Sequence, residues 1–168
     1  MSKSSNLRLL VLIALFIALV AVATMVINVP MVATQGFINV GDTVIFLSAL
    51  LMGPRVGALA GGLGSALADL LLGYTHWAPW TLLIKALEGY IAAVLGYRLY
   101  RQSKKISARV IGALIVSALW MVLGYYIVGG LMVGFKTALA SVPGNLIQGL
   151  GSVILALPLL HAFRNMRL

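Results

Sequence analysis

The sequence predicts an all-α integral membrane protein with six transmembrane helices in a single domain, residues 1–168. Three observations lead to this prediction. The chain is 62% hydrophobic and only 9% charged, whereas soluble domains are about half apolar and a quarter charged. Its apolar residues fall into six runs separated by short connections. Its basic residues gather in the segments that an even number of crossings places on one side of a membrane.

A helix needs about 20 apolar residues to cross the hydrocarbon core of a bilayer. Five runs approach or exceed this length, and the second is short for a full crossing. The expected helices are Leu7–Ile27, Thr43–Met52, Val56–Leu72, Trp80–Tyr100, Val110–Val133 and Thr137–Phe163. No repeat of fixed period and no linker interrupts them, which indicates one domain.

The first run could also be a signal peptide, because Lys3 and Arg8 precede it and Ala21–Ala23 resembles a cleavage site. We favour a retained helix, because the apolar run continues past that site. The Pro- and Gly-containing segment Asn28–Asp42 is expected to be a loop, in which Asp42 is a candidate N-cap of the second helix.

The charge distribution predicts the orientation of the chain. With six crossings, ten of the twelve basic residues share one side: Lys3, Arg8, Arg55, Arg98, Arg101, Lys104, Lys105, Arg109, Arg164 and Arg167. The positive-inside rule makes that side cytoplasmic, so both termini are expected inside the cell. The net charge of +9 is then a feature of topology. No basic run is interleaved with stacking aromatics, which argues against nucleic-acid binding.

The sequence carries no signature of an enzyme. Cysteine is absent, which excludes disulfides and thiolate metal sites. The phosphate loop G-x-x-x-x-G-K-[ST], the metal motif H-E-x-x-H and the nucleophile motif G-x-S-x-G are also missing. We therefore expect no catalytic residues, no metal and no cofactor. Transport would have to draw its energy from an ion gradient or from a partner.

Lys85 and Glu88 lie one turn apart on the fourth expected helix. A charged side chain at the bilayer centre costs about 2.5–3.5 kcal/mol, so such residues usually face a bundle interior or a cavity. Two interpretations are open at this point. The two residues could form an ion pair that only joins helices, or they could line a ligand site.

A polar stripe on the sixth expected helix favours a ligand site. Its members are spaced by four, four, three and four residues and share one helix face: Thr137, Ser141, Asn145, Gln148 and Ser152. Asn and Gln bring donors and acceptors that need partners. Counted from the outer helix ends, Lys85 and Glu88 lie roughly 8–12 Å deep and Asn145 and Gln148 about 12–16 Å deep. The sequence thus predicts a cavity that opens to the outside.

The outer connections offer candidate lid residues. His76 and Trp77 lie in an aromatic loop, Tyr125 lies near the outer end of the fifth helix, and Asn39 lies in the first connection. The aromatic side chains could stack on a flat ring. They could equally form the aromatic belt found at membrane interfaces.

Three stretches resemble the S components of energy-coupling factor (ECF) vitamin transporters, in the riboflavin and hydroxymethylpyrimidine or pyridoxine branch. They are "GFINVGDTVIFLSALLMGPRVGALAGGLGSALADLLLGY", "WAPWTLLIKALEGY" and "PGNLIQG". The resemblance implies a six-helix bundle in the cell membrane that captures a vitamin in an outward-facing pocket. It also implies partners, namely a transmembrane T component and two cytoplasmic ATPases.

The resemblance also implies roles for single residues. The A-x-x-x-A motif by which the first helix docks to the T component matches "ALFIA", at Ala14 and Ala18. The predicted substrate-binding residues are Lys85, Glu88, Asn145, Gln148, Asn39, His76, Trp77 and Tyr125. A B6 vitamer or a hydroxymethylpyrimidine is the expected substrate, with riboflavin as the alternative. An ion-coupled transporter that works alone and a non-transporting scaffold are the competing classes.

Overall fold

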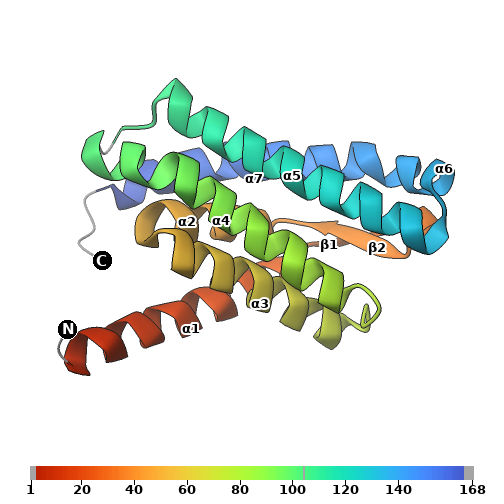
Figure 1. Ribbon diagram of the computed structural model, residues 1–168, viewed down its shortest axis with the longest axis horizontal. Coiled ribbons are helices and arrows are strands. Elements are labelled where there is room, and N and C mark those ends of the chain that lie inside the picture. Colours follow the sequence, from red (N-terminus) through yellow and green to blue (C-terminus); the bar gives the residue numbers. More distant parts are fainter. Residues whose placement is uncertain (1–2, 104, 165–168) are drawn as a thin grey trace.

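The computed structural model describes residues 3–103 and 105–164, and most of them are helical (Figure 1). The helices are α1 (Lys3–Val26), α2 (Gly41–Met52), α3 (Pro54–Leu72), α4 (Ala78–Ser103), α5 (Ala108–Val133), α6 (Phe135–Ala138) and α7 (Val142–Phe163). The described residues also form two strands, β1 (Asn28–Met31) and β2 (Gly36–Asn39), and two short 3-10 turns, η1 (Val32–Thr34) and η2 (Leu139–Ser141).

In the described part of the chain, five helical segments are long and apolar enough to cross a membrane. They are Asn6–Val26, Pro54–Leu72, Ala78–Ser103, Ala108–Val133 and Phe135–Phe163. They coincide with five of the six expected helices. α2 also forms where it was expected, but its 12 residues extend only about 18 Å, against a hydrocarbon core of roughly 30 Å. A sixth full crossing therefore stays a prediction.

The segment expected to be a loop forms a β-hairpin, which an all-α prediction does not include. β1 and β2 pair antiparallel, with Asn28 opposite Asn39 and Met31 opposite Gly36. η1 and the left-handed residue Gln35, at φ 50°, close the tip. With only four residues per strand and Pro30 in the first, the periodic signal of a strand is too short to read from sequence.

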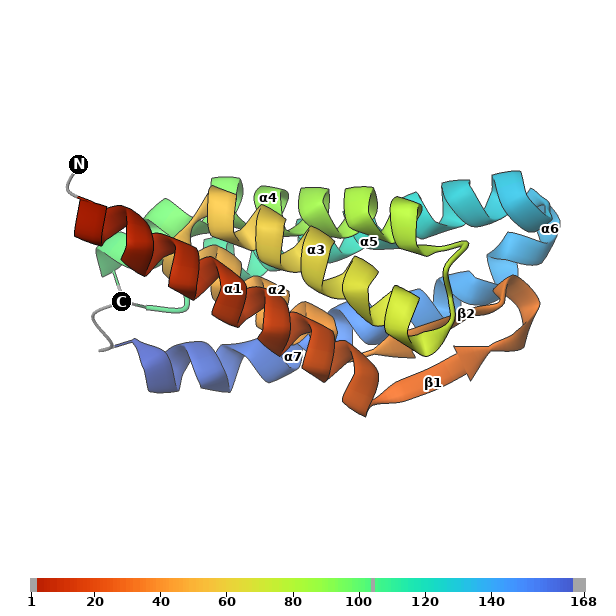
Figure 2. The same cartoon turned by 90° about the horizontal axis from the view of Figure 1, so that it is seen from below.

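The hairpin explains why α2 is short. The hairpin runs from the middle of the bundle to the end at which α6 lies and then turns back. α2 continues in the direction of β2, away from that end (Figure 2). Non-helical backbone is tolerated at membrane depth only where it is buried in protein or lines a cavity. β2 meets this condition, because it is half-buried along its length and its Asn39 N–H donates to Gln148 Oε1 at 2.8 Å.

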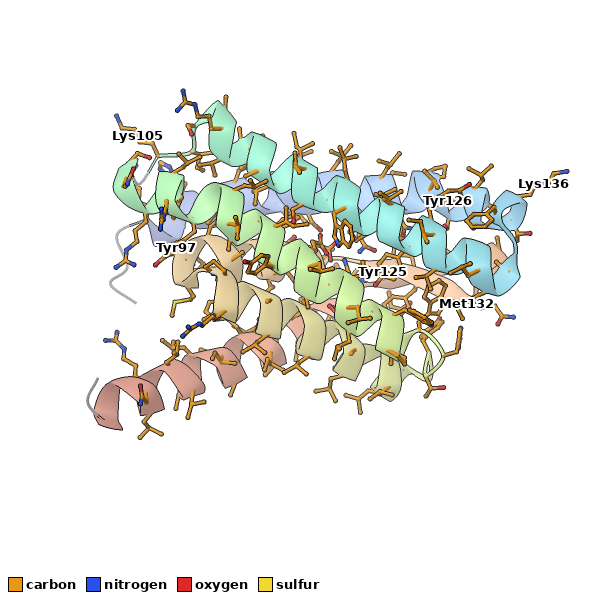
Figure 3. The ribbon with its side chains drawn as sticks, in the orientation of Figure 1. Tyr97, Lys105, Tyr125, Tyr126, Met132 and Lys136 are labelled. Atoms are coloured by element: carbon orange, nitrogen blue, oxygen red, sulfur yellow. The ribbon has the colours of Figure 1, made fainter. Side chains whose placement is uncertain are left out.

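Different segments of the chain lie at the two ends of the bundle. The start of α1, the α4–α5 connection and the end of α7 lie at one end, here called the terminal end (Figure 1). The hairpin tip and α6 lie at the opposite, hairpin end (Figures 1 and 2). Lys105 and Lys136 mark the two ends in Figure 3. Among the basic residues used to predict orientation, Lys104 and Arg167 lie outside the described residues, as does the side chain of Lys3.

Glycines allow α3 and α4 to pack closely. A Cβ atom added to Gly57 would lie 2.8 Å from the carbonyl oxygen of Gly89, and one added to Gly61 would lie 2.5 Å from that of Lys85. Both distances are too short for an ordinary contact. The small residues of α3 therefore let α4 approach, which brings the Lys85 segment next to α2 and α3.

Candidate functional site

A pocket lies between the hairpin and the long helices. It holds about 480 Å³ of atom-free space, its open mouth included. Its lining combines residues from α1, the hairpin, α3, α4, α5 and the η2–α7 segment with Trp77 of the α3–α4 connection. These are Thr24, Met31, Thr34, Gly36, Phe37, Asn39, Ser65, Asp69, Trp77, Thr81, Lys85, Tyr125, Ser141, Asn145 and Gln148. Below it, towards the terminal end, buried apolar side chains of α2, α4, α5 and α7 form a continuous core.

The structure brings together most of the side chains that the sequence singled out. Six of the eight predicted residues line the pocket: Asn39, Trp77, Lys85, Tyr125, Asn145 and Gln148. They come from segments as much as 109 residues apart in the chain. Deep polar groups on separate helices therefore face one common space, as their matching depths predicted.

The other two predicted residues do not line the pocket. Glu88 is completely buried and lies behind Lys85, whose Nζ donates to Glu88 Oε2 at 2.8 Å. His76 is exposed in the α3–α4 connection, with its ring 6.1 Å from that of Trp77. Helical spacing put Glu88 on the correct face of α4, but it could not show that Lys85 would stand between Glu88 and the space.

The expected ion pair is a group of three. Lys85 Nζ donates to the Asp42 carboxylate as well as to Glu88. The interpretation of Asp42 as an N-cap is wrong, because Val40 occupies the cap position and Asp42 lies inside the first turn of α2. The physical reason is burial. Asp42 is 0% exposed, and a buried carboxylate is costly unless it is paired, which the Lys85 ammonium achieves here.

Gln148 extends this network to two further elements. Its Nε2 donates to Asp42 Oδ2 at 2.9 Å, and its Oε1 accepts the Asn39 N–H at 2.8 Å. An ammonium has three N–H donors, of which Lys85 gives two to carboxylates. Its Nζ also lies 5.6 Å from the centroid of the Tyr125 ring, in a cation–π contact. The third Lys85 N–H makes no hydrogen bond to the described residues, and Lys85 lines the pocket.

Aromatic side chains form one wall of the pocket. Trp77 is 5% exposed, and its Nε1 donates to the Thr34 carbonyl at 3.2 Å, which ties the α3–α4 connection to the hairpin tip. Its ring meets Tyr125 edge-on at 5.7 Å. Figure 3 shows Tyr125 between the helices, and its hydroxyl donates to Thr81 Oγ1 at 3.2 Å. Trp77 and Tyr125 thus belong to the interior and not to an interfacial belt.

The pocket side chains with unused hydrogen-bonding capacity include Asn145, Asp69 and Thr24, whose buried Oγ1 has no partner among the described residues. Asn145 is 3% exposed, and its amide makes no hydrogen bond to any of the described residues. Asp69, equally buried, has an Oδ2 atom without a hydrogen-bond partner in the described part of the chain. Buried polar groups are nearly always paired. Side chains that stay unpaired at the wall of a pocket are therefore positioned to bind a ligand.

Two carboxylates at this site, Asp42 and Asp69, were not among the predicted substrate-binding residues, although the sequence contained a signal for them. The chain has three acidic residues, and Asp42, Asp69 and Glu88 all lie at this site. An acidic residue is so costly in a membrane that each of the three was a site candidate on that ground alone. The hairpin and α1 residues of the lining, such as Phe37 and Thr24, carried no comparable signal. Thr137, expected in the polar stripe, is exposed, and η2 separates its helix α6 from α7.

The predicted docking motif lies outside the pocket. Ala14 and Ala18 are both exposed on α1, which is the least buried of the five long helices. α1 therefore presents an apolar face that no described residue covers.

Comparisons with known proteins place this architecture in a family. Residues 4–165 match the family model described as "ECF-type riboflavin transporter, S component". The thiamine precursor transporter HmpT of Lactococcus lactis is 30% identical over 154 residues, covering 91% of this chain and 86% of its own. An uncharacterized protein of Pyrococcus woesei, "in gap 3'region", is 38% identical over 136 residues, covering 81% and 88%.

A solved structure supports the same fold. The S component of a bacterial ECF transporter superposes with a TM-score of 0.69 over 96% of this chain and 97% of its own, at 19% identity. The family match spans nearly all of the described helices and the pocket between them. The resemblance noted in the sequence is therefore confirmed, and the chain belongs to the family of multi-pass membrane S components of ECF-type vitamin transporters.

Proposed function

We propose that this protein captures hydroxymethylpyrimidine, or a similar small heterocyclic vitamin precursor, in the pocket and delivers it into the cell. The observation that carries the proposal is the pairing of an aromatic wall with unpaired polar side chains in one buried space. The name of the Lactococcus lactis relative, a thiamine precursor transporter, favours a pyrimidine. A B6 vitamer is the next candidate. Riboflavin is the alternative, because the matched family model carries that name.

The pocket side chains divide into contact groups and supporting groups. Trp77 and Tyr125 stack against the ring of the substrate, since both are held in place by hydrogen bonds and present apolar surface. Asn145 and the remaining Lys85 N–H bind the polar edge of the ring. Gln148 supports the wall, because both ends of its amide are already engaged.

The three other predicted residues receive different roles. Asn39 supports the wall through its backbone N–H to Gln148 and through its side chain, which accepts the Gly41 N–H at 2.8 Å. Glu88 positions Lys85 and does not touch the substrate. His76 has no part in the pocket and is left out of the proposed site.

The hairpin end faces the outside of the cell in this proposal, and both termini are cytoplasmic. The argument is the positive-inside rule. The start of α1, the α4–α5 connection and the end of α7 share the terminal end, and they carry most of the basic residues. A soluble substrate would therefore reach the pocket from the external solution.

Uptake requires a source of energy, and the chain itself contains no ATP-binding motif. We propose that a T component and two cytoplasmic ATPases supply it, as the family implies. Ala14 and Ala18 are the proposed contact on α1, because their small side chains leave room for a helix of the T component to pack closely.

Native mass spectrometry tests the proposed substrate. The full chain is purified in mild detergent from cells supplied with thiamine precursors, B6 vitamers and riboflavin, and the bound small molecule is released and weighed. The expected mass is that of hydroxymethylpyrimidine. A riboflavin mass would select the alternative. An empty protein that also fails to bind any of these vitamins on titration would favour a scaffold role and overturn the proposal.

A further inference from the structure

We infer that Asp69 is the specificity residue of the pocket, and that it selects substrates that carry an amino group. The inference rests on the proposed function and makes it narrower. It predicts that an amino group of the substrate donates an N–H to Asp69, as an aminopyrimidine or an aminomethylpyridine could. It excludes phosphorylated and carboxylated vitamers, because their anionic groups would be repelled by Asp69.

The position of Asp69 is the first argument. Its side chain lines the pocket from α3 and is 3% exposed, and its Oδ2 atom is buried with no hydrogen-bond partner among the described residues. Thr81, whose Oγ1 accepts the Tyr125 hydroxyl at 3.2 Å, lines the same pocket. One oxygen of the buried Asp69 carboxylate is thus left to accept a donor from a ligand.

The charge balance of the site is the second argument. Three carboxylates and one ammonium lie close together here. Asp69 and Lys85 line the pocket, whereas Asp42 and Glu88 lie outside the lining and pair with Lys85. Asp69 has no ion pair in the described part of the chain. A buried carboxylate that lacks a full set of donors is costly. An amino group on the substrate would supply the missing donor, and the protonated aminomethyl group of an aminomethylpyridine would also supply the missing charge.

The remaining polar groups of the pocket do not duplicate this role. Thr24 Oγ1 is also unpaired among the described residues, but it belongs to a neutral hydroxyl. Trp77, Tyr125 and Gln148 already donate to protein acceptors, and Lys85 and Asn145 can donate to acceptor atoms of a ring. Asn145 can also accept, but it is neutral. Asp69 is therefore the one charged acceptor in the lining with an unpaired oxygen. A site built to bind an N–H discriminates strongly against an analogue that lacks it.

Two pairs of ligands that differ only in the amino group provide the test. One pair is hydroxymethylpyrimidine and its analogue with hydrogen in place of the amino group, and the other is pyridoxamine and pyridoxine. Titration calorimetry on the full chain in detergent should show that the amine binds at least about tenfold more tightly in the pair that the pocket accepts. Asp69→Asn should weaken amine binding at least about tenfold and reduce the ratio within that pair to less than about threefold.

Ser152→Ala is the matched control. The Ser152 hydroxyl is also buried without a partner in the described chain, but it does not line the pocket. Its removal should leave both the affinity and the ratio unchanged. Thermal unfolding completes the control, because Asp69→Asn removes an unpaired charge and should not lower the midpoint. If Asp69→Asn does not fold, the ratio of the affinities for the amine and for its amine-free analogue, measured on the unmodified protein, decides whether the pocket selects an amino group.

Each other result counts against the inference. Equal affinities within a pair that the pocket accepts, or a ratio that survives in Asp69→Asn, would overturn it. Riboflavin carries no amino group, so tight binding of riboflavin that Asp69→Asn leaves unchanged would overturn the inference while the proposed vitamin capture stands. Failure to bind any of these vitamins would overturn both.

Discussion

Gln148 on α7 donates from Nε2 to Asp42 Oδ2 on α2 at 2.9 Å, across 106 residues of sequence. Its other amide atom, Oε1, accepts the backbone N–H of Asn39 in the hairpin. A single side chain therefore joins a long helix, the short helix and the hairpin beside it. The non-helical backbone depends on this contact, because water is scarce at that depth.

Replacement of Gln148 by Leu should destabilise the protein. The change leaves the Asn39 N–H and one Asp42 oxygen without partners, at about 1–3 kcal/mol for each unsatisfied group. Asn145→Leu is the matched control, since Asn145 lies one turn away on α7 and makes no hydrogen bond to the described residues. Thermal unfolding in detergent should show a clear decrease of the midpoint for Gln148→Leu and little change for Asn145→Leu. Equal decreases would contradict the assigned network.

Lys85→Met should prevent stable folding. The variant leaves Asp42 and Glu88 as adjacent buried carboxylates without a cation, and loss of one partner from a buried ion pair costs about 3–5 kcal/mol. The yield of monodisperse protein on size exclusion should decrease sharply.

Neutralisation of both carboxylates should restore folding. In the triple variant Lys85→Met, Asp42→Asn, Glu88→Gln, no buried charge of this group remains unpaired, so the yield should recover. A Lys85→Met variant as stable as the unmodified protein would show that the three residues do not form a buried ionic group.

The long helices could be predicted from the sequence, because a membrane requires an apolar run of a fixed length. Five such runs became helical segments close to the expected bounds, although η2 interrupts the last of them between α6 and α7. The hairpin could not be predicted, since its strands are stabilised by tertiary contacts such as that of Asn39 with Gln148. α2 could be located but not explained, because its length follows from the space that the hairpin occupies.

The part of the site that could be predicted consists of polar residues whose insertion into a membrane costs free energy. Lys85, Asn145 and Gln148 were identified because each is conspicuous in an apolar helix and their depths agree. The order of side chains within the site could not be predicted, so Glu88 was expected at the pocket surface and Asp42 at a helix cap. Periodicity gives the face of a helix, but it does not tell which of two neighbours on that face reaches the cavity.

Gly57→Ala should separate α3 from α4. The added Cβ would meet the Gly89 carbonyl oxygen at 2.8 Å and Ala49 Cα at 2.9 Å. Because these are backbone atoms, the helices themselves would have to move, at about 1–3 kcal/mol. Gly151→Ala is the same change at a helical position with nothing within 4 Å, and it should be neutral or slightly stabilising. Thermal unfolding of the two variants compares them, and equal midpoints would argue against close packing of α3 and α4.

Leu at both Ala14 and Ala18 should abolish vitamin uptake by cells without a change in ligand affinity. Both residues are exposed on α1, away from the pocket lining, so larger side chains would block only the proposed contact with the T component. Uptake is measured with labelled vitamin and affinity by calorimetry. Loss of both would count against a docking role. Uptake by the unmodified protein in cells that lack the coupling-module genes would favour a transporter that works alone.

The central claim is that the polar side chains of α3, α4 and α7 converge on the space in which the substrate binds. The most direct test is the dissociation constant of hydroxymethylpyrimidine for the unmodified protein and for Asn145→Leu, measured by calorimetry on the same day in the same detergent. The account predicts at least about a tenfold increase in the constant, with an unchanged unfolding midpoint. Equal constants for the two proteins would contradict it.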